Sequence, residues 1–141
     1  MTVAVDLDVL GDTRPLWRDW LADAARVLDV DGLPESRLAA AAELDARGAG
    51  NWRTLLERFA EDRAPIYLRP AAEVSAALRA LHAAGTDVVV FTDAPLELAR
   101  VALAQLGAAR RVGNVVTGDP PANATTIVRT RTELFALRRS A

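Results

Sequence analysis

The stretch Val3-Ala4-Val5-Asp6-Leu7-Asp8 decides the fold of this chain. Its apolar, β-branched run is typical of a buried strand, and the strand runs into two acidic residues, Asp6 and Asp8. A second run of the same kind, Asp87-Val-Val-Val-Phe, leads into Thr92 and Asp93. In open parallel sheets, ligands bind beyond the carboxyl ends of the strands. We therefore expect Asp6, Asp8 and Thr92 to converge at one edge of a sheet.

The spacing of apolar residues predicts helices between and after these strands. Three of them separate the two strands, and the alternation of strands and helices indicates an α/β fold with a mostly parallel sheet covered on both faces. Residues 15–64 then form a helical insertion, and residues 1–14 and 65–141 form the α/β core. Within the insertion, three helices are expected to begin near Pro15, Pro34 and Asn51. In the core, three more helices are expected at residues 72–84, 95–106 and 132–138, and two further strands at residues 111–117 and 125–130. Residues 65–70 are expected to form a connector.

Composition excludes several classes of protein. A chain of 141 residues with 51% hydrophobic content is expected to form one domain with an ordinary core. The absence of cysteine excludes disulfides, thiolate zinc sites and cysteine nucleophiles, and it is compatible with the cytoplasm. A net charge of −2 with dispersed arginines argues against nucleic acid as a partner. We expect no signal peptide and no membrane span, because no basic n-region and no apolar segment of about 20 residues occurs.

The row from Val3 to Thr13, followed by the run ending in Thr92, resembles the first two motifs of the haloacid dehalogenase (HAD) superfamily. The resemblance implies a Rossmann-like core with a C1-type helical cap inserted after the first strand. It also implies that Asp6 attacks phosphorus to form an aspartyl phosphate, with Asp8 as general acid and base. A carboxylate can act as a covalent nucleophile, and a second carboxyl nearby can move the proton.

The same resemblance assigns the remaining groups of the site. Thr92, with Asp93, would hold the phosphoryl group. A Mg²⁺ ion would rest on Asp6, on the backbone carbonyl of Asp8 and on Asp119. Such an ion suits the chemistry, because Mg²⁺ prefers oxygen ligands and neutralises charge during phosphoryl transfer. The expected substrate is a small phosphorylated metabolite.

The later HAD motifs are degenerate in this sequence. The third motif supplies a lysine, and the chain has none: all 17 of its basic residues are arginine. Arg110 and Arg111 lie before the place of that lysine, while Arg129 and Arg131 lie after it, so no arginine matches it. Only Gly118-Asp119 resembles the acidic fourth motif, and Val9 stands where the family places a glycine after the second aspartate.

These departures leave three functional hypotheses open. The first is a Mg²⁺-dependent phosphohydrolase. The second is a HAD-like binding or structural protein without turnover, with a homodimer through the cap as one form of it. The third is a dehalogenase, which would use Asp6 without Mg²⁺. Simpler interpretations exist for single residues: Thr92 and Asp93 suit helix caps, and Asp119 before two prolines suits a turn.

Overall fold

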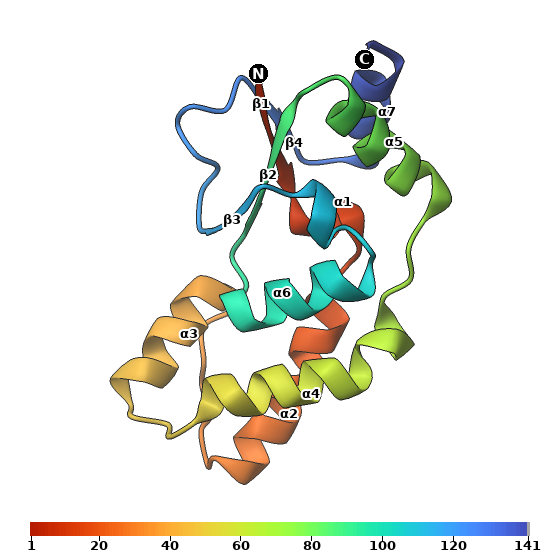
Figure 1. The fold of residues 1–141 in the computed structure, drawn as a ribbon. Coiled ribbons are helices and arrows are strands. Elements are labelled where there is room, and N and C mark those ends of the chain that lie inside the picture. Colours follow the sequence, from red (N-terminus) through yellow and green to blue (C-terminus); the bar gives the residue numbers. More distant parts are fainter. Residues whose placement is uncertain (141) are drawn as a thin grey trace.

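The computed structural model describes residues 1–140, and its centre is a four-stranded parallel sheet (Figure 1). The strand order is β3-β2-β1-β4, so the first strand lies inside the sheet between the second and the fourth. In the pairing register, Asp6 lies opposite Phe91 on β2, and Val5 lies opposite Val128 on β4. The strands are β1 (Thr2–Asp6), β2 (Asp87–Thr92), β3 (Asn114–Thr117) and β4 (Thr126–Val128).

The helices occur close to the predicted positions. The boundaries differ most at α4, which continues through Pro65 to Tyr67, so the predicted connector at residues 65–70 is wrong over its first half. The one-turn helix α1 was not predicted. The helices are α1 (Leu7–Leu10), α2 (Arg14–Val27), α3 (Arg37–Ala46), α4 (Trp52–Tyr67), α5 (Ala72–Ala83), α6 (Leu96–Gln105) and α7 (Arg131–Ser140), with a short 3₁₀ turn η1 (Ala109–Arg111).

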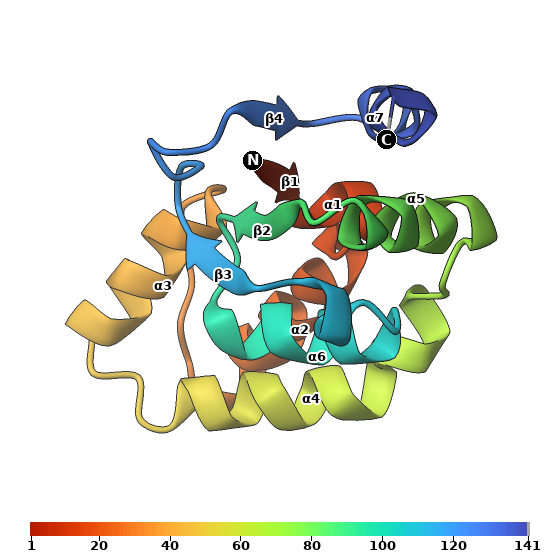
Figure 2. The ribbon, with the colours of Figure 1, turned by 45° about the horizontal axis from the view of Figure 1, so that its top comes forward.

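The two faces of the sheet are covered differently. Helices α5 and α7 lie side by side on one face, over the buried side chains of Val3, Val90 and Val128 (Figure 2). The opposite face is crossed by the connection at residues 118–125, and Ile127 on this face is 40% exposed. The connection between β3 and β4 consists of turns and bends and holds no helix, yet Ala4 and Phe91 on this face are buried.

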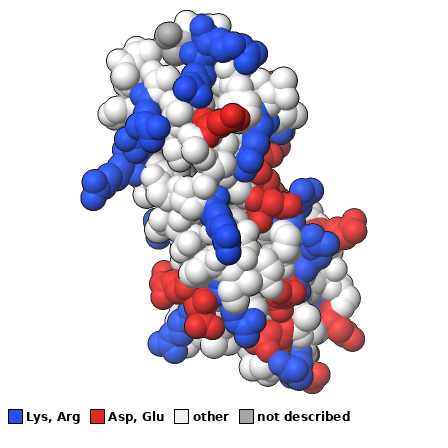
Figure 3. All heavy atoms as spheres, turned by 90° about the vertical axis from the view of Figure 1, so that its right-hand side faces the viewer, with Lys and Arg blue, Asp and Glu red and all other residues white. Residues whose placement is uncertain are grey.

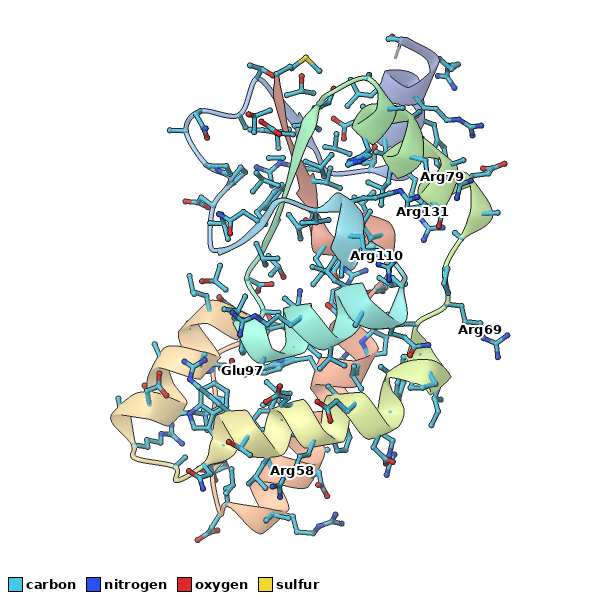
Figure 4. All side chains as sticks on the ribbon, viewed as in Figure 1. Arg58, Arg69, Arg79, Glu97, Arg110 and Arg131 are labelled. Carbon is cyan, nitrogen blue, oxygen red and sulfur yellow. The ribbon has the colours of Figure 1, made fainter. Side chains whose placement is uncertain are left out.

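The segment between β1 and α5 forms a helical layer beyond the carboxyl ends of the strands. Helices α2 and α4 pack together there, and three buried indoles, Trp17, Trp20 and Trp52, contact one another at tilted angles with ring centroids 5.2 and 5.8 Å apart. Helix α6 packs against α4, and Glu97 of α6 accepts a hydrogen bond from Arg53 of α4 at 3.1 Å (Figure 4). We call α2, α3 and α4 the cap. The division into core and cap at residues 15–64 stays a prediction.

Surface charge is mixed on the face that Figure 3 shows. Basic and acidic side chains are interspersed there, and basic side chains gather toward the end of the molecule that carries α7. Within residues 1–140, no helix combines the length and the apolar character needed to cross a membrane.

Candidate functional site

The acidic pair lies where β1 turns into α1. Asp6 is the last residue of β1 and the N-cap of α1, and its Oδ1 accepts the backbone N–H of Asp8 at 2.9 Å. Aspartate is a favoured N-cap because its side chain satisfies a free N–H of the first helical turn. This cap turns the chain sharply after the strand. As a result, the two carboxylates have different surroundings.

The carboxylate of Asp8 is engaged at both oxygens. Its Oδ1 accepts the backbone N–H of Thr13 at 3.0 Å and the Thr13 hydroxyl at 2.6 Å. Its Oδ2 accepts the Nη2–H of Arg37 at 3.0 Å. Thr13 is fully buried, so its hydroxyl depends on these partners.

Arg37 connects the cap to the core. It is the first residue of α3, and although charged it is only 4% exposed. Besides Asp8, its guanidinium donates to Thr13 Oγ1 at 2.6 Å and to Asp93 Oδ1 at 2.8 Å, while its backbone N–H donates to Asp93 Oδ2 at 3.0 Å. We call Arg37, Asp8, Thr13 and Asp93 the Arg37 network. Sequence analysis did not single out Arg37 or Thr13, because an arginine after a capping serine looks like any first-turn residue.

Thr92 and Asp93 occupy the end of β2 next to Asp6. Thr92 is 3% exposed, and its Oγ1 accepts the backbone N–H of Ala94 at 3.1 Å, which leaves the hydroxyl hydrogen available as a donor. Both carboxylate oxygens of Asp93 accept hydrogen bonds from Arg37. A carboxylate only accepts hydrogen bonds, so Asp93 can contribute to binding a phosphoryl group through its backbone N–H alone.

Two cavities meet at the Arg37 network. One of about 320 Å³ lies at the carboxyl edge of the sheet and brings together Asp6, Thr92, Asp119 and Arg129. The other, about 600 Å³, lies on the cap side and is lined by α2 and the start of α3, including Trp17. Asp8 and Asp93 line both cavities, and Arg37 joins them on the cap side. The network therefore lies along the boundary between the two cavities.

Electrostatics distinguish Asp6 within the site. Burial raises the pKa of the half-buried Asp6 carboxyl, and the charge of Asp8 adds to the rise; the hydrogen bond from the Asp8 backbone and the charges of Arg37 and Arg129 oppose it. Arg129 follows β4, and its guanidinium lies 5.2 Å from the centre of the Phe91 ring. Arg129 was noticed in the sequence but not matched to a role, since its distance along the chain did not fit the third motif.

The donor set gives no support to the Mg²⁺ ion that the sequence suggested. Among residues 1–140, no group of three acidic or histidine side chains is placed to share a metal ion. Asp119 lines the same cavity as Asp6, but the residue that follows β4, the strand beside β1, is the cation Arg129 and not a third acid. Hard cations such as Mg²⁺ require oxygen ligands, and a fixed guanidinium nearby disfavours a second cation.

Strand order, a helical cap after the first strand and an acidic pair at the end of β1 together define a HAD-like Rossmannoid α/β fold. The chain is similar to a crystal structure described as "putative beta-phosphoglucomutase from Thermotoga maritima", with a TM-score of 0.51 and 20% sequence identity. The match covers 87% of this chain and 63% of that one, so the chain spans less than two thirds of that protein. At this identity the likeness concerns the fold alone. No family model and no curated protein sequence matches the chain.

Proposed function

We propose that this chain is a HAD-like phosphohydrolase that acts on a small phosphorylated metabolite with Asp6 as the nucleophile. The observation that carries the proposal is that one oxygen of the Asp6 carboxylate is free to attack. Its Oδ1 accepts a hydrogen bond from the backbone of Asp8, whereas no donor within residues 1–140 binds its Oδ2. Asp6 also lines the 320 Å³ cavity together with the buried hydroxyl of Thr92.

In the proposed reaction, a carboxylate oxygen of Asp6 attacks phosphorus while the bond to the leaving oxygen breaks, giving an aspartyl phosphate and an alcohol. Asp8 in its protonated form gives the leaving oxygen its proton. Water then attacks the phosphoryl group, its proton returns to Asp8, and inorganic phosphate leaves with Asp6 restored. Thr92 donates its hydroxyl to a phosphoryl oxygen. Each carboxyl thus has one task, as nucleophile or as proton carrier.

Asp8 can reach a leaving oxygen only after its ion pair with Arg37 opens, because both of its carboxylate oxygens are engaged by Thr13 and Arg37. Arg37 belongs to the cap and Asp8 to the core. Turnover therefore requires a shift of the start of α3 away from the end of β1. Such cap or lid motions gate many enzymes on microsecond to millisecond timescales.

The second candidate function is a HAD-like binding protein without turnover. The observation that favours it is the full engagement of Asp8 by Thr13 and Arg37. If the Arg37 network never opens, Asp8 cannot serve as acid or base, and Asp6 alone would turn over very slowly. Mg²⁺ dependence, suggested by the family resemblance, also stays a prediction.

The test is hydrolysis of p-nitrophenyl phosphate and a panel of phosphorylated metabolites, with Mg²⁺ and with EDTA. The proposal predicts turnover that disappears in Asp6→Asn. The matched control is Asp31→Asn, which makes the same change at an exposed aspartate and should keep wild-type rates. If the folded wild type hydrolyses no compound in either condition, the phosphohydrolase proposal is wrong and the binding protein remains.

A further inference from the structure

We infer that Arg129 is the cation that receives an oxyanion beside Asp6, and that this site binds phosphate without a divalent metal ion. The inference deepens the proposed function and rests on it, since it takes the 320 Å³ cavity as the phosphoryl site. In this inference Arg129, which follows β4, supplies by itself the positive charge that a lysine and Mg²⁺ would otherwise supply.

The contact between Arg129 and Phe91 places the Arg129 side chain over the end of β1. Val128, the last residue of β4, lies opposite Val5, so Arg129 follows β4 directly beside the end of β1, whose last residue is Asp6. Asp6 in turn lies opposite Phe91 on β2. The guanidinium of Arg129 lies 5.2 Å from the Phe91 ring centre, although β4 and β2 are separated by β1. Neighbouring strands are about 4.8 Å apart, so the side chain must cross the end of β1 to reach that ring.

The guanidinium of Arg129 is free to bind an anion. Within residues 1–140, no ion pair and no side-chain hydrogen bond engages its guanidinium; the backbone N–H of Arg129 donates to Glu133. Arg37, the other arginine at the site, is fully engaged in its network. Stacking on an aromatic ring orients a guanidinium and leaves its N–H donors exposed at the ring edge. Arg129 thus presents several donors to the cavity.

The shape and charge of the cavity suit a tetrahedral oxyanion. Thr92 contributes a hydroxyl donor on the β2 side, and Arg129 contributes a bidentate donor on the β4 side, with Asp6 between them. Guanidinium and phosphate match in geometry and form short, charge-assisted hydrogen bonds. Because the same guanidinium repels a divalent cation, phosphate and Mg²⁺ are not expected to bind here together. This arrangement predicts binding in the presence of EDTA.

The experiment is a titration of ¹⁵N-labelled protein with inorganic phosphate, followed by NMR in EDTA and then in Mg²⁺. We expect saturable shifts at the amides of Thr92 and Gly118 in EDTA, with the same affinity in Mg²⁺. Loss of a charge-assisted contact is worth about 1.5–3 kcal/mol, so Arg129→Gln should weaken binding roughly 10- to 100-fold. Arg129→Lys should retain part of the affinity. Arg69→Gln is the matched control, because Arg69 projects away from the body between α4 and α5 (Figure 4).

Three results would overturn the inference: phosphate binding by the wild type only with Mg²⁺, unchanged affinity in Arg129→Gln, or no phosphate binding in either condition. Failure of the proposed function is distinguishable from these. A wild type that binds phosphate through Arg129 but hydrolyses nothing refutes the phosphohydrolase and keeps this inference. A Mg²⁺-dependent enzyme whose turnover survives Arg129→Gln refutes this inference and keeps the phosphohydrolase.

Discussion

Replacing Arg37 by methionine tests whether the Arg37 network holds the cap on the core. Methionine is close to arginine in length and keeps apolar contact, but it removes the guanidinium from Asp8, Thr13 and Asp93. Three side-chain hydrogen bonds are lost, and two carboxylates lose their counter-charge. The backbone N–H of residue 37 still caps Asp93 Oδ2.

The expected cost follows from the burial of the partners. Breaking a buried ion pair from one side costs about 3–5 kcal/mol. Arg37 meets that condition, with a side chain 5% exposed, but the side chains of Asp8 and Asp93 are 20% and 45% exposed and can partly rehydrate. We therefore expect Arg37→Met to lower the free energy of unfolding by about 2–4 kcal/mol, since exposed pairs contribute less. For a domain of this size, that is a fall in Tm of roughly 6–12 °C.

Urea unfolding followed by tryptophan fluorescence is the suitable assay, because all three indoles lie buried in the cap. The matched control is Arg26→Met: among residues 1–140, Arg26 pairs with Asp23 alone, and its side chain is 79% exposed, so the expected loss is below about 1 kcal/mol. A double-mutant cycle of Arg37→Met with Asp93→Asn should give a coupling of about 1 kcal/mol or more. An Arg37→Met protein as stable as the Arg26→Met control would refute the reasoning.

Three further substitutions test the site and its surroundings. Asp6→Asn should raise the free energy of unfolding at pH 7 by up to about 1 kcal/mol. The pKa of Asp6 is raised in the folded protein, so its ionisation lowers stability as pH rises through that pKa, and the gain from Asn should vanish below the ordinary pKa of 3.8. Urea unfolding that shows an equal gain at pH 7 and at a pH below 3.8 would contradict this. Thr13→Val should cost about 1–3 kcal/mol, because Asp8 and Arg37 both lose a buried partner; urea unfolding with no loss of stability would show that water replaces the hydroxyl. Gly11→Ala should cost about 1–3 kcal/mol through overpacking, since a Cβ at this position would lie 2.8 and 2.9 Å from the methyl carbons of Leu106; a Tm equal to that of the wild type would mean that Leu106 moves aside freely.

Local patterns in the sequence predicted most of the fold. The apolar runs at residues 3–7 and 86–91 became β1 and β2, and the helical spacing placed each cap helix within a few residues. Predicting the two strands also predicted the positions of Asp6, Asp8 and Thr92 at or just beyond the strand ends. These features are readable because strand and helix periodicity reflects burial of one face, which each segment records by itself.

Only the tertiary structure decided which distant residues contact one another in the site. Arg37 lies 29 residues from Asp8 and 56 from Asp93, and no local pattern distinguishes it from other first-turn arginines. Arg129 enters the cavity because β4 pairs with β1 and its side chain then crosses toward Phe91. The connection between β3 and β4, which the spacing of apolar residues did not specify, forms turns and bends and no helix. Contacts of this kind depend on strand order and on packing between distant segments, and neither leaves a periodic signal in the residues that make them.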